Sequence, residues 1–245
     1  MHILKSPRAT LCVVAALQLA ACGPHAHIPP RGSVPVPGAA TPGDSIDRLA
    51  RTLAPTLYIQ RDESFPLSRV AAVVNPTRPI IAYHLLWRDD VHGAWIPFTV
   101  PTDEEVVWVG YDPATLAPTE LWTYWHGTIL HTDWRGKGPP AFDVQWGKHG
   151  SLPHGVAEGD LPKLRSLNLF YAFTIIGLPD IWLGNTDRKG PWCFCHGYRR
   201  YMTFDRPVFA GELIDVIARV GDPDPVLSAV FGKKYSKKLS WPWEH

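Results

Sequence analysis

Histidine and carboxylate side chains gather between residues 84 and 154, and these are the groups that hold metal ions or transfer protons. Three acidic residues, Asp103, Glu104 and Glu105, begin a strand-like segment. Because side chains alternate between the two faces of a strand, Asp103 and Glu105 point the same way. Two such carboxylates could share a cation or act as general acid and general base. The candidate catalytic residues are therefore Asp103, Glu105, His126 and His149.

Two neighbouring strands are expected to position these groups. Residues 106–111 read Val-Val-Trp-Val-Gly-Tyr and predict a strand that ends at Asp112-Pro113. A second strand is expected over 120–126, and the prolines between the two suit the connection of an antiparallel pair. In such a hairpin Asp103 and His126 lie at the same end, as an acid–base pair or an oxygen/nitrogen metal site requires.

Three aromatic residues near these groups are candidate ligand-binding residues, namely Trp122, Tyr124 and Trp146. Trp122 and Tyr124 share one face of the second expected strand with His126. An aromatic ring covers the apolar C–H surface of a sugar, so such a platform favours a carbohydrate ligand. The chain has 11 Trp, however, and most of them must lie in the core.

The same polar residues also have a structural interpretation. Glu104 and Glu105 are charges that an edge strand uses to discourage sheet pairing. His126 suits a turn, and His149 suits a brace for the Gly-rich loop 147–155. The sequence contains no Gly-rich phosphate loop, HExxH, Gly-x-Ser-x-Gly or CxxC, which excludes the common nucleotide, zinc-protease, serine-hydrolase and thioredoxin sites.

The first residues of the chain predict export. Lys5 and Arg8 precede the apolar run 11–21, which is too short to span a bilayer. The segment Leu19-Ala20-Ala21-Cys22 resembles the lipobox of bacterial lipoproteins. The resemblance implies that Cys22 becomes the mature N-terminus and carries acyl chains such as palmitate, and that Gly23 directs the protein to the outer membrane. The alternative is an ordinary secretory signal with an incidental cysteine.

Composition and patterning predict one globular body after this leader. The 245 residues are 45% hydrophobic and 19% charged, so the chain can bury a core. The net charge is +1, so there is no basic excess for a nucleic-acid partner. We expect three parts, a signal peptide over 1–21, a Pro/Gly-rich tether over 22–43 and a single β-sandwich domain over 44–245.

The expected elements are mostly strands. Short apolar runs bounded by Pro, Asn or acidic residues predict strands at 57–60, 70–74, 80–87, 142–146 and 198–204. The run 142–146 alternates apolar and polar residues, as a half-buried strand does. Helices are expected over 44–53 and 213–220, whereas 167–178 suits a strand or a helix. The prediction is a mainly β fold, an antiparallel β-sandwich with one or two peripheral helices.

Two further groups of residues leave alternatives open. Cys193 and Cys195 favour a structural role, as buried thiols or a bent disulfide, over a metal site. Four lysines near the C-terminus form a basic patch that we expect on the solvated surface, with contact to anionic lipid or lipopolysaccharide as the alternative. These are Lys233, Lys234, Lys237 and Lys238.

Three short motifs occur in the order found in a known superfamily. They are Asp103-x-Glu105 before Val-Val-Trp-Val, His126-Gly127 after a Trp/Tyr strand, and the turn Gly147-Lys148-His149-Gly150-Ser151. Together they resemble the β-sandwich superfamily of the necrosis-inducing proteins and the related vacuolar-sorting-associated domains. The resemblance implies that fold, and it implies that Asp103 and Glu105 hold a divalent cation such as Mg²⁺ or Ca²⁺.

Two functions follow as hypotheses. The first is an outer-membrane lipoprotein that binds a carbohydrate or an envelope glycolipid, with or without a divalent cation. The alternative is a hydrolase, either glycoside hydrolase-like or metal-assisted, in which Asp103 or Glu105 acts with His126 or His149.

Overall fold

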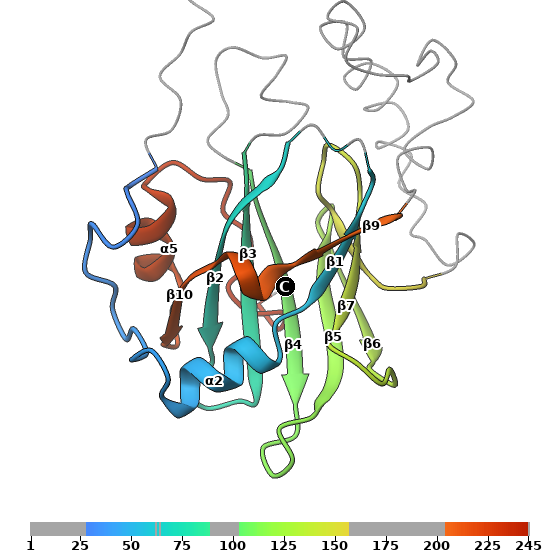
Figure 1. The fold of residues 1–245 in the computed structure, drawn as a ribbon, viewed down its shortest axis with the longest axis horizontal. Coiled ribbons are helices and arrows are strands. Elements are labelled where there is room, and N and C mark those ends of the chain that lie inside the picture. The colour runs from blue at the N-terminus through green and yellow to red at the C-terminus, as the bar shows by residue number, and fades with distance from the viewer. Residues whose placement is uncertain (1–27, 62, 64, 89–102, 157–203, 245) are drawn as a thin grey trace, which may run out of the picture.

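The structure, a computed structural model, describes residues 28–61, 63, 65–88, 103–156 and 204–244. These residues form two sheets and short helices (Figure 1). The larger sheet has the order β10 (Ile214–Arg219), β2 (Leu67–Val74), β3 (Ile80–Trp87), β4 (Glu104–Tyr111), β5 (Pro118–Trp125), β6 (Thr128–Asp133). The smaller has the order β8 (Ser151–Pro153), β7 (Ala141–Val144), β1 (Thr56–Ile59), β9 (Arg206–Phe209). The helices are α2 (Ser45–Thr52), the 3-10 turn η3 (Ala210–Leu213) and α5 (Asp224–Phe231).

The main core lies between the two sheets, which confirms the expected β-sandwich. Leu57 of β1 and Phe142 of β7 pack in one cluster with Tyr83 and Val107 of the larger sheet, and all four are fully buried. Helix α2 completes this layer, since the Tyr83 hydroxyl donates to the Ala50 carbonyl at 2.8 Å. Burial of these large side chains is the main stabilising contribution to such a fold.

Most strand pairs are antiparallel, and two are parallel. β1 pairs parallel with β7, and β10 pairs parallel with β2. The hairpin expected at the site is confirmed, because β4 and β5 pair antiparallel and Val107↔Thr123 is the pair nearest the Asp103 end. A polar turn at 112–117 connects the two strands, in which Asp112 Oδ1 accepts from the Ala114 N–H at 2.7 Å.

Two predictions about elements are wrong. The expected helix at 213–220 is mostly strand β10, because Ile214, Val216 and Ile217 add to the open edge of β2 and complete the sheet there. The strand at 142–146 ends at Val144 and is buried throughout rather than half-buried. Its polar residue Asp143 is satisfied by the Gly155 N–H at 2.9 Å and by His154 Nδ1 at 2.6 Å.

The C-terminal segment 232–244 and helix α5 cover part of the outer face of the larger sheet (Figure 1). The Trp108 indole N–H donates to the Ser240 carbonyl at 2.9 Å and holds this segment on β4. None of the helices in the described part of the chain is long and apolar enough to cross a membrane. The predictions for 1–21, 167–178, 198–203, Cys22, Cys193 and Cys195 lie outside the described residues.

Candidate functional site

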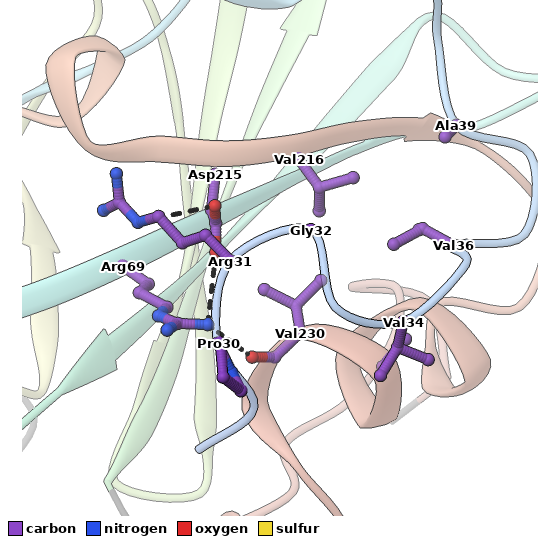
Figure 2. Close-up of a pocket in the computed structure, with 11 residues that line it drawn as sticks. Pro30, Arg31, Gly32, Val34, Val36, Ala39, Arg69, Asp215, Val216 and Val230 are labelled. Atoms are coloured by element: carbon purple, nitrogen blue, oxygen red, sulfur yellow. Dashed lines mark hydrogen bonds and ion pairs between the residues drawn. The ribbon is translucent and has the colours of Figure 1, made fainter.

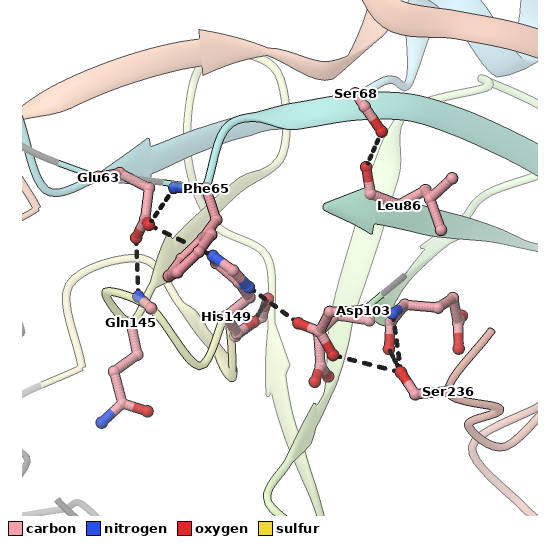
Figure 3. A network of polar contacts seen from close by, with 12 residues as sticks. Glu63, Phe65, Ser68, Leu86, Asp103, Gln145, His149 and Ser236 are labelled. Atoms are coloured by element: carbon pink, nitrogen blue, oxygen red, sulfur yellow. Dashed lines mark hydrogen bonds and ion pairs between the residues drawn. The ribbon is translucent and has the colours of Figure 1, made fainter. Parts of the chain in front are cut away.

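Asp103 and His149 meet in a buried polar network at one end of the sandwich (Figure 3). The Asp103 carboxylate lies just before β4, and its Oδ2 is 2.8 Å from Nδ1 of His149 in the β7–β8 turn. On the other side of the ring, His149 Nε2 is 3.6 Å from Glu63 Oε1. The Trp87 ring stacks on the imidazole at 4.0 Å and 2°. The site therefore holds one imidazole between two carboxylates and against an aromatic face.

This arrangement makes His149 a buried cation at neutral pH. Burial alone lowers its pKa, but the carboxylates of Glu63 and Asp103 outweigh burial and raise the pKa to about 9. Burial raises the pKa of Asp103, but the hydrogen bond from His149 and its charge lower it overall. An imidazolium cannot accept a proton, so in this state His149 braces the β7–β8 turn against β4 and supplies no general base.

Glu105, the second predicted carboxylate, has a different partner. Its Oε1 lies 3.1 Å from Nζ of Lys238 in the C-terminal segment. Burial is the main reason that the Glu105 pKa rises to about 8, and Asp103 and Glu104 add to it while Lys238 opposes the rise. The expectation that Lys238 is solvated is wrong, because only 18% of its side chain is exposed. The pKa of Lys238 is raised, since the carboxylates outweigh the effect of burial.

Glu104 points to the opposite face of β4 and joins the C-terminal segment to the sheet. Its Oε1 is 2.8 Å from His84 Nδ1, and its Oε2 accepts from the Lys238 N–H at 3.1 Å. The Ser236 hydroxyl donates to Asp103 Oδ1 at 3.2 Å. Sequence reasoning missed Glu63, Ser236 and Lys238 as members of this network, because no local pattern marks contacts between residues that lie more than eighty positions apart.

His126 reaches the same end of the hairpin but contacts Gln145 rather than Asp103. Its Nε2 lies 2.6 Å from Gln145 Oε1, and burial lowers its pKa to about 4. The residue sits in the β5–β6 turn with φ 47°, a left-handed conformation. A Cβ on Gly150 would lie 2.7 Å from His126 Nε2, so a side chain there would displace the His126 ring.

Both carboxylates of the predicted metal pair already contact cationic side chains. Oxygens of Asp103 and Glu105 already face His149 and Lys238, which are cationic. Within the residues that the structure describes, no group of three His, Cys, Asp or Glu side chains is arranged to hold a metal ion. A divalent cation at Asp103 and Glu105 stays a prediction without support from this geometry.

A second group of polar and aromatic side chains lies on the outer face of β5 and β6. We call it the β5–β6 strip: Glu120, Trp122, Tyr124, Ile129 and His131. His131 stacks on Trp122 at 3.8 Å and 27°, and its Nε2 is 2.9 Å from Glu120 Oε2. Their cross-strand register, Trp122↔His131, brings these groups together.

The strip is partly open to solvent, unlike the buried network. The His131 and Glu120 side chains are 38% and 39% exposed, and Trp122 and Tyr124 are half-buried. The Trp122 indole N–H has no hydrogen-bond partner among the described residues. Lys238 Nζ lies 5.8 Å from the centre of the Tyr124 ring. The third predicted ligand-binding residue, Trp146, is fully buried, so its position adds no support to that role.

Comparison with known proteins gives a low-level structural similarity. No protein family and no curated protein matches the chain. NLPPya in complex with mannosamine matches at 15% identity over 54% of this chain and 78% of that chain, with a TM-score of 0.36. The complex with glucosamine matches at 16% identity over 54% and 78%, with a TM-score of 0.38.

A structure described as "Toxin fold as basis for microbial attack and plant defense" matches at 15% identity over 54% of this chain and 79% of that chain, with a TM-score of 0.34. TM-scores below 0.5 do not establish a common fold. The mainly β sandwich rests instead on the two sheets of the chain itself.

Proposed function

We propose that this chain is a lipid-anchored protein of the cell envelope, bound to the outer membrane, whose β-sandwich binds carbohydrate. The observation that carries the binding part is the β5–β6 strip, where half-buried Trp122 and Tyr124 lie beside a solvent-exposed His131–Glu120 pair. Aromatic rings cover the C–H surface of a sugar, and neighbouring carboxylate and imidazole groups hydrogen-bond its hydroxyls. A free polysaccharide and the sugar part of an envelope glycolipid both present this chemistry.

The buried network supports the strip through Lys238. Glu105 and Glu104 hold Lys238 by its side chain and its backbone N–H, and the ammonium stays near the Tyr124 ring. These contacts fix the position of Lys238, whose side chain is only 18% exposed. Glu104 and Glu105 therefore act, in this proposal, as positioning residues for a cation beside the ligand.

The membrane anchor in this proposal rests on the leader sequence alone. Lys5, Arg8, the apolar run 11–21 and the lipobox ending at Cys22 occur in the order that lipoprotein export requires. Several acyl chains on one cysteine anchor a protein stably to a bilayer, because each buried methylene contributes about 0.8 kcal/mol.

The test of carbohydrate binding is a glycan panel with matched variants of aromatic residues. Trp122→Ala and Tyr124→Ala should each bind the recognised glycan about tenfold more weakly, measured by titration calorimetry. Trp243→Ala is the control, since Trp243 is 40% exposed and stacks on Trp241 instead of lying on the strip. Equal affinities for all three variants and the wild type would contradict a ligand site on the strip.

The hydrolase alternative would use the 2.8 Å contact between Asp103 and His149 in the state in which His149 has lost its proton, since the charged ring supplies no general base. The same panel tests it by measuring the release of cleaved sugar over time. If the wild type releases cleaved sugar and the Asp103→Asn and Glu105→Gln variants do not, the protein is a hydrolase rather than a binding protein. Metal analysis of the purified protein before and after chelation tests the predicted divalent cation in the same samples.

A further inference from the structure

The segment before the domain is attached to it. Ala39 pairs with Ala218 of β10, and the Ala40 N–H donates to the Ile217 carbonyl at 2.8 Å. Further toward the N-terminus, Arg31 Nε is 3.5 Å from Asp215 Oδ1, and the same carboxylate is 3.3 Å from Arg69 (Figure 2). Residues 28–43, expected to be a tether, thus contact the domain along β10 and beside α5.

The described chain begins next to a basic stretch. Ile28 packs against the cluster that contains Phe231 and Tyr235, the two residues that flank Lys233 and Lys234. Figure 1 shows the start of the described chain beside the end of α5. Lys233, Lys234 and Lys237 are all exposed. Among the described residues, Asp215 contacts both Arg31 and Arg69, and Asp224 pairs with Lys237, so the five cations named here outnumber these two carboxylates.

The distance from this surface to the anchor is short. Ile28 lies six positions after Cys22, and an extended chain of six residues spans at most about 20 Å. If Cys22 is acylated, Ile28 lies within that distance of the bilayer surface whatever path the connection takes. The basic residues beside Ile28 are then held near the lipid head groups.

From this placement we infer that Lys233, Lys234 and Lys237 form a contact surface for an anionic bilayer, so that the domain has a fixed orientation on the membrane. The inference rests on the proposed lipid anchor. Anionic phosphate head groups attract lysines within about a Debye length of the surface, and the acyl chain keeps the lysines inside or close to that range. The β5–β6 strip lies at the edge of the larger sheet opposite β10.

The test uses the full lipidated protein in vesicles of phosphatidylcholine with or without phosphatidylglycerol. The rate of lysine acylation by an amine-reactive reagent is measured residue by residue with peptide mass spectrometry. Lys233 should react about threefold more slowly in the anionic vesicles at low salt, and high salt should remove the difference. Lys137, an exposed lysine of the β6–β7 connection, is the control and should react equally in both.

A charge-reversal variant completes the test. In Lys233→Glu with Lys234→Glu, both exposed and thus tolerant of substitution, anionic vesicles should no longer protect Lys237. If Lys233, like Lys137, reacts at the same rate in both kinds of vesicle while Cys22 is shown to be acylated, the proposed contact surface is wrong and the anchor is unaffected. A Cys22 peptide of unmodified mass would instead overturn the anchor itself.

Discussion

At the residue scale, His149 shows how burial and charge together set a protonation state. The ring is fully buried, yet the carboxylates of Glu63 and Asp103 stabilise its charged form. Glu105 is the opposite case, because burial and two neighbouring carboxylates favour its neutral form. A buried charge is tolerated only where partners of the opposite sign lie in contact, as they do here.

Stability should fall as pH rises through the weakly alkaline range. The folded pKa of His149 is about 9, above the ordinary 6.5, so its contribution is complete below pH 6.5 and lost as pH rises through 9. Glu105, with a raised pKa of about 8, acts in the same direction between 4.5 and 8. The His149 part is about 3 kcal/mol. Urea unfolding at pH 6.5 and 9 measures the difference, and a flat profile would contradict the charged network.

Removing the imidazole should leave uncompensated buried carboxylates. His149→Ala is expected to lower the free energy of unfolding by about 3 to 5 kcal/mol at neutral pH. The control is His131→Ala, because His131 and its partner Glu120 are exposed and such a pair contributes under about 1 kcal/mol. Equal losses in the two variants would show that the network around His149 does not brace the fold.

At the element scale, strand β10 connects the domain with the segment that precedes it. One edge of β10 pairs with β2, and its other side receives residues 38–40. The Arg219 N–H donates to the Gly38 carbonyl at 2.9 Å. Gly38 has φ 62°, and a Cβ there would lie 2.5 Å from Val220 Cγ1 and 2.9 Å from the Arg219 carbonyl oxygen. The attachment of this segment thus requires a residue without a side chain at position 38.

Gly38→Ala should loosen this attachment more than Gly32→Ala does. Both glycines have positive φ, so alanine brings about 1 kcal/mol or more of backbone strain at either position. Only at Gly38 does the new methyl group also meet backbone, since nothing lies within 4 Å of the Cβ position at Gly32. Amide hydrogen exchange at Ala40 and Arg219 measures the effect. The same protection in both variants would contradict the close contact.

At the scale of the whole molecule, other elements cover most of both faces of the larger sheet. The four-stranded sheet and α2 cover the inner face of the larger sheet, and α5 with residues 232–244 covers part of its outer face. The outer face of β5 and β6 keeps exposed polar groups beside aromatic rings. A ligand can therefore reach the strip without opening the core, which agrees with a binding function.

Membrane attachment of the whole protein should depend on a single cysteine. In the full chain expressed in bacteria, Cys22→Ser should abolish incorporation of labelled fatty acid and move the protein out of the detergent phase. Cys12→Ser is the matched control, because Cys12 lies inside the expected signal peptide and should change neither result. Fatty-acid labelling that persists in Cys22→Ser would contradict the prediction that Cys22 is the acylated residue.

The sequence by itself determined the elements whose signals are local. Helix α2 follows Asp44, whose side chain caps it, and β3 covers the expected residues 80–87. The β4–β5 hairpin followed from apolar strands on either side of a proline-containing turn. These signals depend on neighbours within a few residues, so periodicity and capping are enough to find them.

Only the tertiary structure decided which distant groups meet. Glu63, His149 and Asp103 form one network although they lie on separate segments, and the C-terminal chain brings Lys238 to Glu105. Strand β10 forms where a helical pattern was expected, because the open edge of β2 offers its residues backbone hydrogen bonds and burial. Such contacts depend on how the sheets pack and on which edge remains unpaired, and these long-range interactions override local preference.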